Sequence, residues 1–241
     1  MLKLSDRRNF GRTATGLALI AGPLLILIAS IVSPDTDHSD KLRELSAIAA
    51  HKGPYLLSGV IFLIASMVLM LAAIGLIQMF RGSRGVTLGQ VAGVLLLFGS
   101  AVSFGWYGLG AIEYEMVNQK GIDRGAMAQL LHKADNASSL LPLIILFLLG
   151  IVVGLILLGI AAWRTGVVPR PLAALIILQG PISFFSNGKV GSIVSGVILL
   201  VALGSLGRRA LSMSDEEWDG PGASHTGAPP RAGAPAPGPA A

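Results

Sequence analysis

Cysteine is absent from the 241 residues, which excludes disulfides, thiolate metal ligands, iron–sulfur clusters and cysteine nucleophiles. Charge is scarce as well, because only 13% of the residues are Asp, Glu, Lys or Arg, against roughly 25% in a typical globular domain. The few charges are clustered and leave long stretches with none. Since 53% of the residues are hydrophobic, more than a soluble fold of this size can hide from water, the composition predicts an integral membrane protein.

The uncharged stretches are long enough to cross a bilayer as helices. A helix rises 1.5 Å per residue and the hydrocarbon core is about 30 Å thick, so about 20 apolar residues span it. Four stretches exceed that length, and the last two, of 18 residues each, barely reach it. Apolar runs without the alternation of barrel strands favour helices. We therefore expect an all-α polytopic transmembrane helical bundle of about six spans, near residues 13–34, 54–80, 86–112, 139–163, 171–187 and 190–207.

Basic residues indicate which side of the bundle faces the cytoplasm, where short loops are enriched in Lys and Arg. They occur before the first span, in the two shortest loops and after the last span, as Lys3, Arg7, Arg8, Arg12, Arg81, Arg84, Arg164, Arg170, Arg208 and Arg209. Both termini are thus predicted to be cytoplasmic. The loops 35–52 and 113–135, with six basic and eight acidic residues, then lie on the outer face.

These patterns divide the chain into three parts. Residues 1–12 form a basic cytoplasmic N-terminus, residues 13–207 the six-span domain, and residues 208–241 a cytoplasmic tail. Residues 220–241 contain 18 Gly, Pro or Ala, a composition that cannot build a core, so we expect the tail to be disordered. Before them, Ser214 to Glu217 matches a capping box. No apolar run follows it, so only a short turn is expected there.

The region 171–207 has two interpretations. It either forms a tight hairpin of two full spans, or the segment Gln179-Gly180-Pro181 breaks the fifth helix, which then dips into the bilayer without crossing it. The hairpin is favoured, because Arg170 and Arg208 then lie on the same side.

Polar residues inside the expected spans are few and none of them is ionisable. They are Ser58, Ser66, Gln78, Gln90, Ser100, Ser103, Gln179, Ser183, Ser192 and Ser195. Proton-coupled carriers and intramembrane hydrolases usually keep a charged group at depth. The absence of such a group argues against both classes, and no catalytic or cofactor-binding residue is predicted.

The outer loops hold the only gathering of potential metal ligands: Asp35, Asp37, His38, Asp40, His51, Glu113, Glu115, His132 and Asp135. Imidazoles and carboxylates together can bind a divalent ion. The best candidates are His51, Glu113, His132 and Asp135, since all four follow or precede span ends on one side. No established metal-site spacing is present, and bases such as Lys52 and Lys133 would repel a cation. We therefore expect solvated surface residues and no metal site.

Several short patterns predict local packing. Leu42, Leu45, Ile48 and Ala49 are spaced as one face of a helix over residues 41–51, which we expect to lie on the membrane surface. Aromatic residues near span ends are expected to be interfacial anchors, namely Trp106, Tyr107 and Trp163. Small residues four apart allow helices to approach closely within the bundle, as at Gly89 and Gly93, Gly150 and Gly154, and Ser192 and Gly196.

Two segments carry a resemblance to a known family. Residues 45–53, Leu-Ser-Ala-Ile-Ala-Ala-His-Lys-Gly, run directly into an apolar span, and residues 164–170, Arg-Thr-Gly-Val-Val-Pro-Arg, lie between two spans. Together they resemble actinobacterial multi-span membrane proteins of unknown function, over roughly residues 13–207. The resemblance implies a six-helix bundle in the plasma membrane, and it implies no substrate, cofactor or catalytic residue.

Three functions fit these observations. The first is a non-enzymatic protein of a bacterial plasma membrane that binds membrane lipids, a membrane-protein partner or a second copy of itself, or supports the envelope. The second is a small-molecule or ion permease with Gln179 near its pathway. The third is a metal-dependent enzyme on the outer face that uses His51 and His132. We favour the first, because the spans are uncharged. The clustering of basic residues beside spans indicates no nucleic-acid partner.

Overall fold

The computed structural model describes residues 7–36, 40–80, 85–119, 121, 123–185, 188–214 and 217–218. Within these ranges every regular element is helical and no strand occurs, which confirms the all-α prediction. Several residues used above lie outside the described ranges: Lys3, Asp37, His38, Arg81, Arg84 and the tail residues 219–241. The elements, in order, are α1 (Arg7–Val32), α2 (Lys41–Ala50), α3 (Lys52–Met79), α4 (Val86–Asn118), α5 (Arg124–Asp135), η1 (Ser138–Leu140), α6 (Leu141–Leu148), η2 (Leu149–Val153), α7 (Gly154–Thr165), α8 (Arg170–Phe185) and α9 (Gly188–Ser212).

Five helical stretches are long and apolar enough to cross a membrane: Phe10–Val32, Lys52–Met79, Val86–Asn118, Ser138–Thr165 and Gly188–Ser212. The fourth is continuous from η1 through α7. The remaining expected span, the fifth at 171–187, corresponds to α8, whose 16 residues extend roughly 24 Å. α8 runs without interruption through Pro181. The break that the second interpretation places at Gly180-Pro181 is therefore absent, whereas a full crossing by α8 stays a prediction. The chain is a polytopic helical membrane protein.

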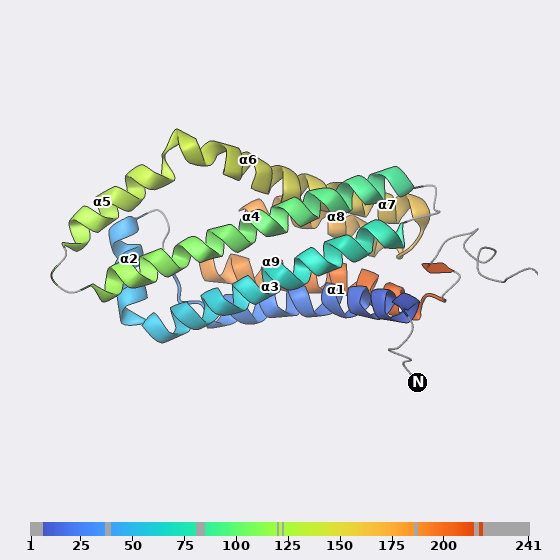
Figure 1. Ribbon diagram of the computed structural model, residues 1–241, viewed down its shortest axis with the longest axis horizontal. Coiled ribbons are helices and arrows are strands. Elements are labelled where there is room, and N and C mark those ends of the chain that lie inside the picture. The colour runs from blue at the N-terminus through green and yellow to red at the C-terminus, as the bar shows by residue number, and fades with distance from the viewer. Residues whose placement is uncertain are drawn as a thin grey trace, which may run out of the picture.

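The membrane helices form a closed ring in the order in which they follow along the chain. α1 packs on α3, α3 on α4, α4 on α7, α7 on α8, α8 on α9, and α9 returns to α1. We call the end of the ring where α1 begins and α9 ends the short-loop end. At the opposite end, called the cap end, α2 and α5 lie beyond the ring (Figure 1).

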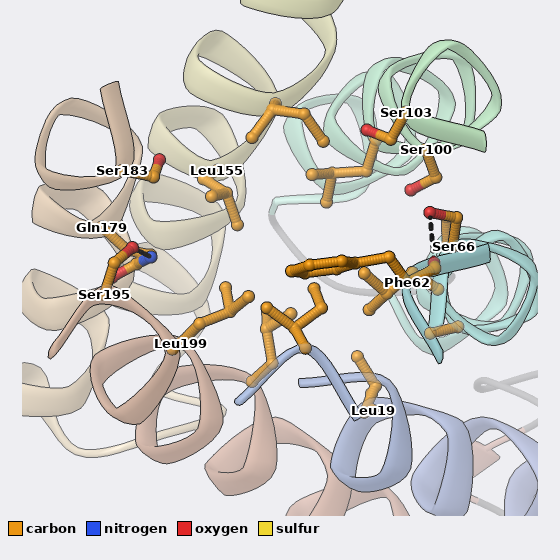
Figure 2. A pocket seen from close by; sticks show the side chains of 18 of the residues that line it. Leu19, Phe62, Ser66, Ser100, Ser103, Leu155, Gln179, Ser183, Ser195 and Leu199 are labelled. Atoms are coloured by element: carbon orange, nitrogen blue, oxygen red, sulfur yellow. Dashed lines mark hydrogen bonds between the residues drawn. The ribbon is translucent and has the colours of Figure 1, made fainter. Parts of the chain in front are cut away.

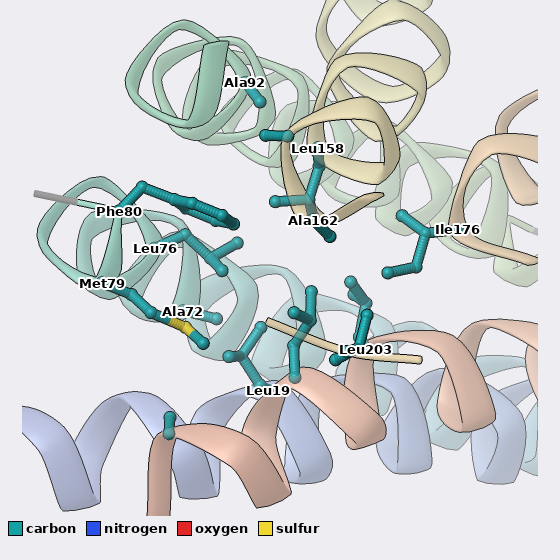
Figure 3. Packing of buried hydrophobic residues seen from close by; sticks show 14 of the residues in the cluster. Leu19, Ala72, Leu76, Met79, Phe80, Ala92, Leu158, Ala162, Ile176 and Leu203 are labelled. Carbon is teal, nitrogen blue, oxygen red and sulfur yellow. The ribbon is translucent and has the colours of Figure 1, made fainter. Parts of the chain in front are cut away.

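The hydrophobic core fills the short-loop half of the ring (Figure 3). Large side chains from all six ring helices meet there with less than a tenth of their surface exposed, among them Leu19, Leu76, Leu96, Leu158, Ile176 and Leu203. The expected capping box is confirmed, because Ser214 and Glu217 exchange hydrogen bonds of 3.1 and 3.2 Å. The turn that it starts places Trp218 against this core with 6% of its surface exposed, a contact that the sequence did not predict.

Glycines allow the helices to approach closely, as expected. A side chain at Gly150 would collide with the backbone of Gly99 on α4, and one at Gly93 would lie 3.1 Å from the carbonyl oxygen of Ala73 on α3. Gly150 belongs to η2, a π-helical turn between α6 and α7. On the other side of η2, a side chain at Gly180 would lie 2.8 Å from the carbonyl oxygen of Val152. This widened turn is therefore held between α4 and α8, and such turns frequently occur at functional sites.

The cap is built on an extension of α4. This helix has 33 residues, or roughly 50 Å, and so is longer than the hydrocarbon core is thick. Its last turns carry Val117, which packs with Met127 of α5 and with Leu45 and Ile48 of α2. Leu45 and Ile48 are fully buried. The predicted helix at 41–51 therefore exists, and α4 and α5 cover part of its apolar face, while Leu42 on the same face is exposed. Its expected position on the membrane surface stays a prediction.

Candidate functional site

A cavity of about 260 Å³ lies inside the ring, on the cap side of the core (Figure 2). On α3 its lining residues run from Phe62 to Leu76, whereas the core residues of the same helix run from Ala72 to Met79. Every segment of the ring contributes to the wall: α1, α3, α4, the continuous α6–η2–α7 helix, α8 and α9. The core thus closes one end of the cavity, and the rest extends toward the cap.

The polar residues of the spans converge on this cavity. Seven of the ten named from the sequence line it: Ser66, Ser100, Ser103, Gln179, Ser183, Ser192 and Ser195. Ser30 and Tyr107 line it too, and sequence reasoning missed them, because Ser30 lies near the end of the first span and Tyr107 was read as an interfacial anchor. A spacing of three or four residues connects the lining positions within each helix, as at 62, 66 and 69 of α3 or 96, 100 and 103 of α4. This repeat is the signal that could have found the site.

An aromatic pair forms part of the wall. Phe62 of α3 and Tyr107 of α4 stack with their ring centroids 4.4 Å apart and their planes 1° from parallel. Both residues line the cavity. Tyr107 therefore belongs to the site, in contrast to the expected anchoring role, while its neighbour Trp106 is exposed.

Most of the lining hydroxyls donate their proton to their own helix. Ser66 donates to the carbonyl of Phe62 at 3.0 Å, Ser103 to Gly99 at 2.9 Å, and Ser183 to Gly180 at 2.8 Å. Serines in apolar helices commonly make this bond to the preceding turn. Because each proton is engaged, the hydroxyl oxygens offer the cavity lone pairs, which accept hydrogen bonds.

Gln179 is the most buried polar residue of the wall, with 1% of its surface exposed. Its Nε2 donates to Ser195 Oγ at 2.9 Å, which joins α8 to α9. Its Oε1 is the one buried side-chain oxygen or nitrogen in the described part of the chain that has no hydrogen-bond partner. An unpaired buried group of this kind costs about 1–3 kcal/mol. Figure 2 places Gln179 and Ser195 together on the wall opposite Phe62 and Ser66.

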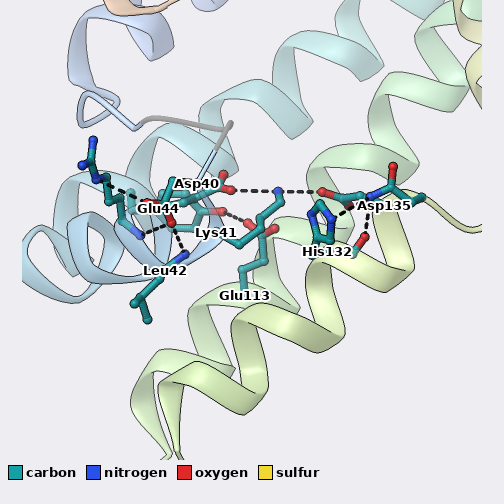
Figure 4. A network of polar contacts seen from close by, with 10 residues as sticks. Asp40, Lys41, Leu42, Glu44, Glu113, His132 and Asp135 are labelled. Atoms are coloured by element: carbon teal, nitrogen blue, oxygen red, sulfur yellow. Dashed lines mark hydrogen bonds and ion pairs between the residues drawn. The ribbon is translucent and has the colours of Figure 1, made fainter.

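At the cap end, the predicted metal-ligand candidates occupy a separate polar network (Figure 4). Lys41 Nζ lies 2.7 Å from Asp135 Oδ2 and 2.8 Å from Glu44 Oε2. Glu113 accepts a hydrogen bond of 2.7 Å from the Tyr55 hydroxyl. Lys41 thus joins α2 to α5, and the bond between Tyr55 and Glu113 joins α3 to α4.

The network keeps the lysine charged. Burial by itself lowers the pKa of Lys41, but hydrogen bonds and charge attraction from Asp135 and Glu44 outweigh it, so the pKa is raised above 10.5. The ammonium group therefore occupies the position between carboxylates that a bound cation would take.

Each of the four best metal-ligand candidates contacts another group in the structure. Asp135 pairs with Lys41 and Glu113 with Tyr55, while the His51 ring contacts the carbonyl of Ala47 at 3.3 Å. His132 lies 3.5 Å from the side-chain nitrogen of Asn136. In the residues that the structure describes, no group of three or more His, Asp or Glu is arranged to hold a metal ion.

A family model described as a domain of unknown function (DUF4386) matches residues 14–211. This range agrees with the extent of the family resemblance seen in the sequence. No curated protein and no solved structure matches the chain.

Proposed function

We propose, for a chain that belongs to the DUF4386 family of domains of unknown function, that it acts in the membrane by binding a small, mostly apolar molecule inside its ring of helices. The observation that carries this proposal is the convergence of six span serines and one span glutamine on one cavity. Polar residues in a lipid-embedded bundle that served packing alone have no reason to face the same space from four different helices.

The size of the cavity sets the size of the bound molecule. An apolar protein cavity of about 150 Å³ holds benzene, so by proportion about 260 Å³ accommodates roughly ten non-hydrogen atoms. Its walls are mainly Leu, Ile, Phe and Ala, with hydroxyls at intervals. A short amphiphile, or the end of a lipid chain, matches both the volume and the lining.

Binding is favoured over catalysis by the chemistry of the wall. None of the described residues that line the cavity is Asp, Glu, His, Lys or Arg, and general acid–base catalysis most often uses these side chains. The protein is thus proposed to be non-enzymatic. We place it in a bacterial plasma membrane with both termini in the cytoplasm, where the bilayer supplies its ligand.

A permease is the second candidate function. It is favoured by the depth of the site, since Gln179 lies nine residues into α8 from Arg170, or roughly 14 Å along the helix axis. A binding site near the bilayer midplane is typical of transporters. Net movement of a bound molecule across vesicles would distinguish transport from binding.

The binding proposal predicts where a photoreactive ligand attaches. Purified protein in nanodiscs is irradiated with an eight-carbon alkanol that carries a diazirine, and adducts are mapped by mass spectrometry. We expect adducts on lining residues of at least three helices, such as Phe62, Ser100 and Gln179, that excess 1-octanol prevents. Adducts confined to lipid-facing residues such as Leu71, which is 63% exposed, would contradict the proposal.

A cavity-filling variant provides the control. Ser103→Phe places a ring in the cavity and should reduce labelling of the other lining residues severalfold, because little volume remains. Ser205→Phe makes the same substitution on α9 at a partly buried serine that does not line the cavity, and it should leave labelling unchanged.

A further inference from the structure

The cavity combines an unpaired acceptor with a wall whose protons are largely engaged. Gln179 Oε1 is buried and has no hydrogen-bond partner, while the amide nitrogen of the same side chain is held by Ser195. With the nitrogen paired in this way, the oxygen is the end of the amide that remains available. A buried amide oxygen in a low-dielectric interior gains far more from a donor than the same group does in water.

The serine hydroxyls of the wall add further hydrogen-bond acceptors to the cavity but few free donors. Ser183, four residues further along α8, gives its proton to Gly180, and Ser192 of α9 gives its proton to Gly188 at 3.0 Å. Ser66 and Ser103 on the opposite wall do the same. A ligand in the cavity therefore meets several oxygen lone pairs, while most of the wall's hydroxyl protons are already engaged.

We propose that the cavity selects a neutral molecule that donates a hydrogen bond, such as an alcohol with an apolar body. Gln179 Oε1 is the acceptor of that hydrogen bond. This inference rests on the proposed binding function and specifies its ligand class. The alcohol proton pairs with Gln179 Oε1, and the hydrocarbon part lies against Phe62, Leu199 and their neighbours.

The ligand is neutral because the wall carries no charge to pair with it. The described lining residues include no carboxylate and no basic side chain, and moving an unpaired charge into such surroundings costs far more than one hydrogen bond returns. An alcohol loses only its bonds to water, and Gln179 replaces one of them. The donor, rather than charge or size alone, thus determines the preference.

Competition among matched ligands tests the inference in the wild-type protein. Labelling by the diazirine alkanol is measured against 1-octanol, 2-octanone and octane, which differ in donor capacity but little in size. Because 2-octanone accepts but cannot donate, it leaves Gln179 Oε1 unpaired, and we expect it to compete about tenfold more weakly than 1-octanol. Equal competition by the ketone would overturn the inference while leaving the binding proposal intact. A complete absence of cavity adducts would instead overturn the binding proposal.

Substitution of the glutamine assigns the preference to one side chain. Gln179→Leu removes the acceptor, so the advantage of 1-octanol over 2-octanone should disappear while octane competes at least as well as before. Gln179→Met is a second variant with an unbranched chain that disturbs packing less, and it should behave in the same way. Gln90→Leu, at a partly buried span glutamine outside the cavity wall, should keep the preference. A tenfold preference retained in both Gln179 variants would refute the assignment.

Discussion

At the scale of single residues, Lys41 determines how the cap is held. It lies at the first position of α2, where Asp40 caps the helix by accepting hydrogen bonds from the backbone nitrogens of Leu42 and Arg43. Its side chain, 13% exposed, reaches Glu44, whose side chain is 4% exposed. A carboxylate buried to that degree requires a partner. The lysine therefore neutralises Glu44 and at the same time attaches α5 through Asp135.

Removing this lysine is predicted to loosen the cap. Lys41→Met retains the length of the side chain but removes a cation that pairs with buried Glu44, and breaking a buried pair costs about 3–5 kcal/mol. We expect faster amide hydrogen exchange in α2 and α5 and unchanged exchange in α1, α3 and α9. Arg43→Met is the matched control, because Arg43 pairs with Asp40 at the surface, where an ion pair contributes about 1 kcal/mol or less.

The same contact has a predicted dependence on pH. Since the pKa of Lys41 is raised above 10.5 in the folded protein, its pairing contributes fully below pH 10.5 and is lost as the pH rises through the folded-state value. The protection of α5 amides, after correction of the exchange rates for their general rise with pH, should therefore fall in the wild type at strongly alkaline pH, and the Lys41→Met variant should lack this fall. Identical alkaline profiles would show that another contact holds the cap.

At the scale of helices, the sequence predicted which small residues lie at helix contacts better than it predicted which residues they contact. Glycines four apart indicated close approach, and Gly93, Gly150 and Gly154 all pack against a neighbouring helix. The sequence could not show that Gly150 meets Gly99, because that depends on the π turn at η2, which changes the helix face by one residue. The burial of Trp218 could not be predicted either, because a single aromatic residue after a short turn forms no periodic pattern.

The contact between α4 and η2 is predicted to tolerate no side chain. Gly99→Leu would place its Cβ within 2.8 Å of the backbone of Gly150, so the two helices must separate, and overpacking of this kind costs about 1–3 kcal/mol or more. Gly105→Leu adds the same side chain to the same helix where nothing lies within 4 Å. We expect a lower apparent Tm, with weaker photolabelling of the cavity, for the first variant only.

At the scale of the whole molecule, the fold was largely predictable and the site only in part. Helices, their number and their approximate bounds follow from hydropathy and charge, which act locally. To predict the cavity, one must know how each helix is rotated about its axis. The polar positions of one span do not reveal whether they face lipid, a neighbouring helix or the ring interior. Ring closure by α1 and α9 fixes those rotations, and it joins segments that lie at opposite ends of the sequence.

The last prediction concerns the orientation of the ring in the membrane. The basic residues of the short loops and termini predict that the short-loop end is cytoplasmic. Reporter fusions after Ser83, after Thr165 and at the C terminus should all read cytoplasmic, and fusions after Thr36 and Gln119 should read periplasmic. The pair Thr165 and C terminus tests the hairpin of α8 and α9. In the fold α8 begins and α9 ends at the short-loop end, so the two reporters should agree. A periplasmic signal at the C terminus alone would mean an odd number of crossings and would refute the hairpin, because Arg208 and Arg209 would then lie outside against the charge bias.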